Sequence, residues 1–132
     1  VFIGDIFRWG EALIQVTQPR SPCFKINFHF GIANLASLMQ QSARTGWLYR
    51  VINDGAVSRD APLELASRLS DVSVHNAAAI AWHQPFDDEQ YHRLLSAPGL
   101  SVSWTRTMQK RRDSHKIESF SRRLWGNKPA VK

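Results

Sequence analysis

The feature that most constrains the fold is a change in hydrophobic pattern near Ser70-Asp71. Before this point, short runs rich in aromatic and β-branched residues are separated by Gly, Pro and Asn turns, a pattern typical of strands. After it, apolar residues recur at helical spacing. Strands followed by helices, rather than alternating with them, indicate an α+β fold. We therefore predict a β-rich part over residues 1–70 and a small three-helix domain over residues 71–132.

The β-rich part contains one clear half-buried strand over residues 11–18. There Ala12, Ile14 and Val16 fall on one face, because successive side chains of a strand point to opposite sides. Weaker patterns predict further strands over residues 3–10, 47–52 and 63–69, and a helix of about three turns over residues 32–39 that ends near Gly46.

The second part divides into three predicted helices, over residues 77–82, 89–96 and 102–112. Gln84-Pro85 and Ala97-Pro98-Gly99 separate them, and Asp87 and Ser101 have the short polar side chains preferred at helix N-caps. The apolar residues expected to pack these helices together are Ile80, Trp82, Tyr91, Leu94, Leu95, Trp104 and Met108.

Length, composition and cysteine usage exclude several classes of protein. The 132 residues suit about one domain, and 43% hydrophobic residues are enough to bury a core. No apolar run reaches the roughly 18–20 residues of a membrane span, and no signal peptide is recognisable. The single cysteine, Cys23, excludes an internal disulfide and suits a reducing compartment. We therefore expect a cytoplasmic protein without membrane association, and Val1 in place of Met indicates a fragment.

The excess positive charge is concentrated at the C-terminal end. Of the formal net charge of +6, residues 106–132 supply nine Lys or Arg against only Asp113 and Glu118. One interpretation is a surface that binds nucleic-acid phosphates, with Trp104 and Trp125 stacking on the bases. A related interpretation is a surface that docks to an acidic protein. The other is a solvated helix face, which we favour because Arg106, Lys110 and Asp113 recur at helical spacing around Trp104 and Met108 as the buried side. No nucleic-acid motif is present. Nucleic acid is therefore not an expected partner.

Cys23 is the residue that the pattern favours for chemistry. It comes just after a strand, directly behind the stiff turn that runs from Pro19 to Pro22. Arg20 and Lys25 place positive charge beside it, which favours the thiolate. A thiolate is both a nucleophile and a soft metal ligand. The competing interpretation is a buried cysteine that acts as a small apolar side chain.

The histidines and glycines give weaker indications. The five histidines are scattered without zinc-type spacing, and His29, between Phe28 and Phe30, is interpreted as a packing residue. No glycine-rich phosphate loop is present, which disfavours the common nucleotide-binding folds.

Four segments resemble a known family. Gln18-Pro19-Arg20-Ser21-Pro22-Cys23-Phe24-Lys25, with Ile3-Gly4-Asp5 before it and Thr45-Gly46-Trp47-Leu48-Tyr49-Arg50-Val51 after it, is similar to the MOSC family, the molybdenum cofactor sulfurase C-terminal domain. The helical end resembles the three-helix (3-alpha) domain that follows MOSC in bacterial YiiM-type 6-N-hydroxylaminopurine-resistance proteins. This resemblance covers nearly the whole chain.

The resemblance implies a fold and an activity. The fold is the C-terminal part of a MOSC β-barrel followed by the three-helix domain, and the activity is a molybdenum-dependent oxidoreductase that reduces N-hydroxylated bases and amines. Cys23 would be the catalytic molybdenum ligand of a molybdenum cofactor (Mo-pterin), with Ser21, Arg20 and Lys25 as further cofactor-binding residues. A flavin reductase would supply electrons, a homodimer is a candidate assembly, and pyridoxal phosphate binding is a further property associated with the family.

Two alternatives and one departure remain. The protein could instead be a sulfur carrier with a persulfide on Cys23, or a noncatalytic basic binding module. The family's Val-His-Gly-Gly-type and Gly-Glu-Asn segments, which precede Ile-Gly-Asp, have no counterpart here. We therefore expect the N-terminal half of the barrel to be missing, which would leave exposed strand edges and an open core.

Overall fold

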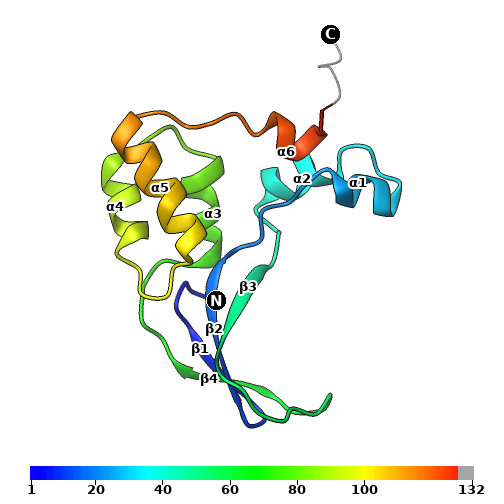
Figure 1. Ribbon diagram of the computed structural model, residues 1–132, viewed down its shortest axis with the longest axis vertical. Helices are drawn as coiled ribbons and strands as arrows, with labels where there is room; N and C mark the ends of the chain where they lie inside the picture. The colour runs from blue at the N-terminus through cyan, green and yellow to red at the C-terminus, as the bar shows by residue number, and fades with distance from the viewer. Residues whose placement is uncertain (128–132) are drawn as a thin grey trace.

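The computed structural model describes residues 1–127 as an antiparallel sheet with helices at one end (Figure 1). The strands are β1 (Ile6–Trp9), β2 (Ala12–Pro19), β3 (Trp47–Asn53) and β4 (Leu63–Ser67), in the order β3-β2-β1-β4. The helices are α1 (Lys25–Phe30), α2 (Leu35–Ser42), α3 (Val74–Trp82), α4 (Asp88–Leu95), α5 (Val102–Ser114) and α6 (Ser121–Trp125). Within residues 1–127, every helix is too short or too polar to cross a bilayer.

The α+β fold agrees with the prediction, but two helices were not expected. Helices α1 and α6 have six and five residues, and no side chain caps the N-terminus of either one. The helix predicted over residues 32–39 begins at Leu35 and ends at Ser42, where Ala43, rather than Gly46, adopts the left-handed conformation that terminates it. The last five residues of the predicted three-helix domain lie outside the described residues.

Strand β2 is the centre of the β-rich part. Ala12, Ile14 and Val16 are buried on one face, as the alternating pattern predicts. In contrast, every residue of β3 and β4 is exposed, including the aromatic side chains of Trp47 and Tyr49. These two strands form the edges of the sheet, and their side chains are exposed along their whole length.

One hydrophobic core joins the sheet to helices α3, α4 and α5. The predicted residues Tyr91 and Leu94 are fully buried in it, and Ser101 and Asp87 cap their helices as predicted, each accepting a backbone N–H bond. The core also contains residues from before the predicted boundary, among them Val16 of β2. The three-helix domain therefore packs on the sheet instead of standing apart from it. The boundary near residue 70 stays a prediction.

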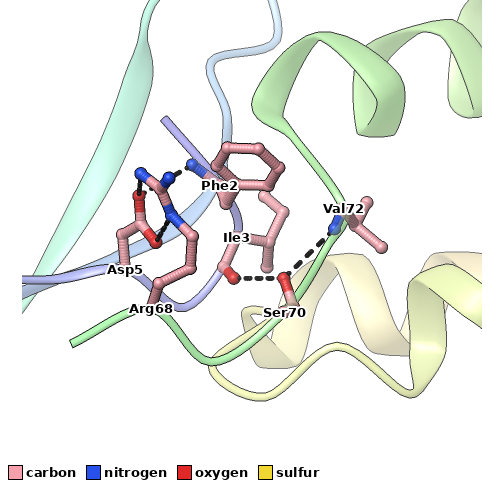
Figure 2. Close-up of polar contacts among 6 residues, drawn as sticks. All are labelled: Phe2, Ile3, Asp5, Arg68, Ser70 and Val72. Carbon is pink, nitrogen blue, oxygen red and sulfur yellow. Dashed lines mark hydrogen bonds and ion pairs between the residues drawn. The ribbon is translucent and has the colours of Figure 1, made fainter.

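The Ile3-Gly4-Asp5 motif is a structural joint (Figure 2). The fully buried carboxylate of Asp5 accepts two hydrogen bonds of 3.0 Å from the Arg68 guanidinium and a third from the Phe2 N–H. The guanidinium also lies 4.2 Å from the centre of the Phe2 ring, which is within cation–π range. The motif therefore ties the N-terminal segment to the end of β4.

Ser70 extends this joint toward the three-helix domain. Its hydroxyl donates to the Ile3 carbonyl at 2.6 Å and accepts from the Val72 N–H at 3.3 Å, as Figure 2 shows. The Ile3 N–H in turn donates to the Val72 carbonyl at 2.8 Å. The chain therefore leaves the sheet in a fixed direction before α3 begins.

Candidate functional site

The candidate site is built on the loop between β2 and α1. The Arg20 N–H donates to the Gly46 carbonyl at 3.0 Å. This hydrogen bond ties the start of the loop to the residue directly before β3. Pro22 is buried, and Cys23 is half-buried. The Lys25 N–H lies 3.4 Å from the Cys23 sulfur, so the first turn of α1 directs a backbone dipole at the thiol.

This loop forms one wall of a surface depression of about 580 Å³. All four residues predicted to bind a cofactor, Arg20, Ser21, Cys23 and Lys25, lie on it. The two cationic side chains are exposed. The structure therefore brings the thiol and two positive charges to one open surface.

His29 lines the same depression, which the interpretation as a packing residue missed. Its ring does contact that of Phe30 edge-on, with centroids 4.8 Å apart, but the His29 side chain is exposed. Residues four apart on a helix share a face, so α1 places His29 on the same side as Lys25. The signal was present in the sequence, but it required α1 to be recognised as a helix.

Helix α6 holds the loop in place through hydrogen bonds. The Phe24 N–H donates to the Arg123 carbonyl at 2.7 Å, and the Arg123 guanidinium donates to the carbonyl of Pro22 and to the side-chain oxygen of Gln40. Asn27 also donates to the Leu124 carbonyl at 3.4 Å. Sequence reasoning counted Arg123 only as part of the basic end, because nothing local indicates a contact with residue 22.

Arg123 is also electrostatically coupled to the site. Burial lowers the pKa of its guanidinium below the ordinary value, and the nearby charge of Arg111 acts in the same direction. The carboxylate of Glu118 and the thiol of Cys23 act in the opposite direction. Arg123 therefore acts on the loop through its hydrogen bond to Pro22, and it does not line the depression itself.

The basic residues near the C-terminal end do not all lie in the same environment. Trp104 and Met108 are buried while Arg106, Lys110 and Asp113 are exposed, which confirms the predicted helix face.

Two arginines of this segment are occupied by carboxylates. Arg111 is only 3% exposed and forms a paired contact with Glu118, at 2.8 and 2.6 Å. Arg112 binds both carboxylate oxygens of Asp88, at 2.7 and 3.0 Å. The positive charge of the segment therefore does not form one continuous phosphate-binding surface.

The Arg111–Glu118 pair makes stability dependent on pH. The hydrogen bonds from Arg111 lower the pKa of Glu118 below its ordinary value of 4.5. The unfolded chain therefore binds more protons than the folded one at acid pH, and the stabilisation present above about pH 4.5 is lost as pH falls through the lowered pKa. We expect the free energy of unfolding, measured by urea denaturation between pH 6 and 3, to fall more steeply in wild type than in Glu118→Gln. Equal slopes would contradict this assignment.

The protein side chains around Cys23 suit a metal whose other ligands come from a cofactor. Within residues 1–127, no three His, Cys, Asp or Glu side chains gather as a metal site. Cys23 is a single soft sulfur ligand. A cofactor that carries its own sulfur ligands and is anionic fits this surface, because Arg20 and Lys25 are placed to balance its charge.

Family models match both parts of the chain. The MOSC domain matches residues 1–64, and the YiiM-like, 3-alpha helix domain matches residues 72–115. The chain belongs to the MOSC family, in its YiiM-type branch. Domains of the MOSC family typically bind molybdenum cofactor, and the family is generally related to oxidoreductases. Helix α6, which supports the Cys23 loop, lies outside both matched ranges.

Curated relatives and solved structures resemble this chain over about half of its length or more. It is 74% identical over 126 residues to Protein YiiM of Escherichia coli (strain K12), covering 96% of this chain. The crystal structure of YiiM from Escherichia coli superposes with a TM-score of 0.94 and 74% identity, covering 96% of this chain and 63% of that one. A protein named Reductase from Gibberella moniliformis is 35% identical over 69 residues, covering 52% of this chain and 12% of its own length. The chain spans only 56% and 52% of the first two curated relatives.

Proposed function

We propose that this chain forms the thiol-bearing part of a MOSC oxidoreductase that reduces N-hydroxylated bases and amines, such as 6-N-hydroxylaminopurine, with a molybdenum cofactor held by Cys23. The observation that carries the proposal is the half-buried Cys23 thiol in an open depression with Arg20 and Lys25. A structural cysteine would instead be enclosed by apolar side chains.

Each residue on the depression has a distinct part in this proposal. Cys23 ligates the metal, and Arg20 and Lys25 bind the anionic groups of the cofactor. The Ser21 hydroxyl donates a hydrogen bond to the cofactor. His29, on the same wall, is positioned to donate a proton to the departing oxygen.

The overall reaction needs an external reductant. Two electrons and two protons break the N–O bond, so that the amine is released and the oxygen leaves as water. When bound, the cofactor supplies a metal centre that exchanges two electrons and removes oxygen from the N-hydroxyl group. We propose a flavin reductase as the electron donor. The exposed Arg106 and Lys110 of α5 offer a positively charged surface for an acidic partner of this kind. A cytoplasmic location and a homodimer belong to the same proposal.

Replacing the thiol tests the proposal directly. We expect Cys23→Ala to reduce the molybdenum and pterin content of the intact, purified protein to background and to abolish reduction of 6-N-hydroxylaminopurine. The midpoint of thermal unfolding should change little, because the side chain is half-exposed. Metal analysis, pterin fluorescence and a reductase assay are the measurements.

Two variants control this experiment. Lys25→Gln removes a nearby charge but keeps the thiol, and it should retain molybdenum with weaker binding. Thr105→Ala, on the exposed part of α5, should behave as wild type. Full activity in Cys23→Ala would overturn the proposal, and a stable persulfide on Cys23 without bound metal would favour the sulfur carrier.

A further inference from the structure

A second cavity lies next to the Cys23 loop and shares Ser21 with the depression. It has a volume of about 360 Å³ and is bordered by the end of β2 and by residues of α3, α5 and the segment that leads into α6. Three aromatic residues and three hydroxyl residues contribute to its lining: Trp82, Trp104, Phe120, Ser21, Ser103 and Thr107. We name it the aromatic cavity. Its volume is within the range typical of small-molecule sites, about 300–1,000 Å³.

The aromatic residues are held firmly in place. Trp82 and Trp104 contact each other edge-on with ring centroids 5.9 Å apart, and Trp104 is only 5% exposed. The Arg123 guanidinium lies 5.5 Å from the centre of Trp82 and 5.4 Å from that of Phe120. These flat groups pack on one another and form a rigid wall of the cavity, against which a planar ring can lie.

The charged groups of the cavity are already occupied. Arg111 donates to Glu118, to the Ala81 carbonyl and to the Tyr91 hydroxyl. Arg123 donates to Pro22 and Gln40, as described above. Neither guanidinium therefore presents a free bidentate fork to a phosphate, and a neutral ligand fits this cavity better than an anion.

The hydroxyl groups remain available. Among the hydrogen bonds formed within residues 1–127, none involves the hydroxyl of Ser21, Ser103 or Thr107. Each of these groups can both donate and accept. A neutral ring with nitrogen atoms on its edge could satisfy them while its faces contact the aromatic side chains.

Ser21 connects this cavity with the proposed catalytic site. It borders both the aromatic cavity and the depression that contains Cys23. We infer that the aromatic cavity binds the planar heterocyclic ring of the substrate, a neutral purine-type base, next to the depression that contains Cys23. The inference rests on the proposed function for the identity of the substrate, but the binding of the base can be measured without metal.

The test uses matched substitutions on one helix. Thr107→Met fills the cavity, whereas Thr105→Met makes the same change at an exposed position of α5 outside it. Binding of 6-N-hydroxylaminopurine to the intact, molybdenum-free protein is measured by calorimetry. We expect Thr107→Met to weaken binding at least about tenfold and Thr105→Met to change it less than about twofold.

A second variant guards against misfolding. Thr107→Val keeps the size of the side chain and removes only the hydroxyl, so it should fold as wild type and weaken binding several-fold. No binding by the wild type at millimolar base, or equal binding by Thr107→Met and Thr105→Met, would overturn the inference. Absence of molybdenum from the wild type would overturn the proposed function but not the binding site, so the two failures are distinguishable.

Discussion

Replacing Gly4 with alanine is expected to lower the free energy of unfolding by about 3–5 kcal/mol, the sum of backbone strain and overpacking. Gly4 has a φ of +87°, and a Cβ at this position would overlap the backbone carbonyl of Pro98. The Pro98 carbonyl is part of the backbone, so it cannot avoid the added Cβ by a simple side-chain rotation. Urea denaturation followed by tryptophan fluorescence measures the loss.

Gly31→Ala separates the two causes. Gly31 also has a positive φ, +65°, but a Cβ there would meet no atom within 4 Å. This control should therefore cost only about 1 kcal/mol, from the left-handed backbone alone. Equal losses for the two variants would show that the contact between Gly4 and Pro98 is not tight in solution.

Replacing Arg111 with alanine is expected to cost about 3–5 kcal/mol, as is typical when one partner of a buried charged network is removed. The side chain is 3% exposed and bonds to three groups from different segments: the Ala81 carbonyl of α3, the Tyr91 hydroxyl of α4 and the Glu118 carboxylate. Its loss leaves the first two polar groups buried without a partner. Because domains of this size are only about 5–15 kcal/mol stable, a large fall in the midpoint of thermal unfolding should result.

The neighbouring residue provides the control. Arg112 forms an equally well-aligned pair with Asp88, but the Asp88 side chain is 57% exposed and the Arg112 side chain 26%. Exposed ion pairs contribute at most about 1 kcal/mol, so Arg112→Ala should change stability little. A loss for Arg112→Ala as large as that for Arg111→Ala would contradict the distinction between the two arginines.

The sequence was most informative where the pattern was local. Alternation over β2 identified its buried face, and the N-caps Asp87 and Ser101 marked the starts of α4 and α5. These features depend on side chains close together in the chain, where strand and helix periodicity act. The resemblance to the MOSC family depended on equally local motifs around Cys23.

The site was less predictable where distant segments meet. Helices α1 and α6 have too few residues to show a period, and the segment around Phe28 has the aromatic content of a strand. Without α1, His29 could not be placed beside Lys25. Arg123 reaches Pro22 across 101 residues, a pairing that no local rule could have indicated.

This last contact also determines when the site can form. A nascent chain emerges from its N-terminal end, so the Cys23 loop is synthesised long before α6. Until α6 arrives, the Pro22 carbonyl lacks its guanidinium partner and the Phe24 N–H lacks its acceptor. The thiol should therefore reach its final position only after α6 has been synthesised, and the cofactor proposed to bind there would load after that point.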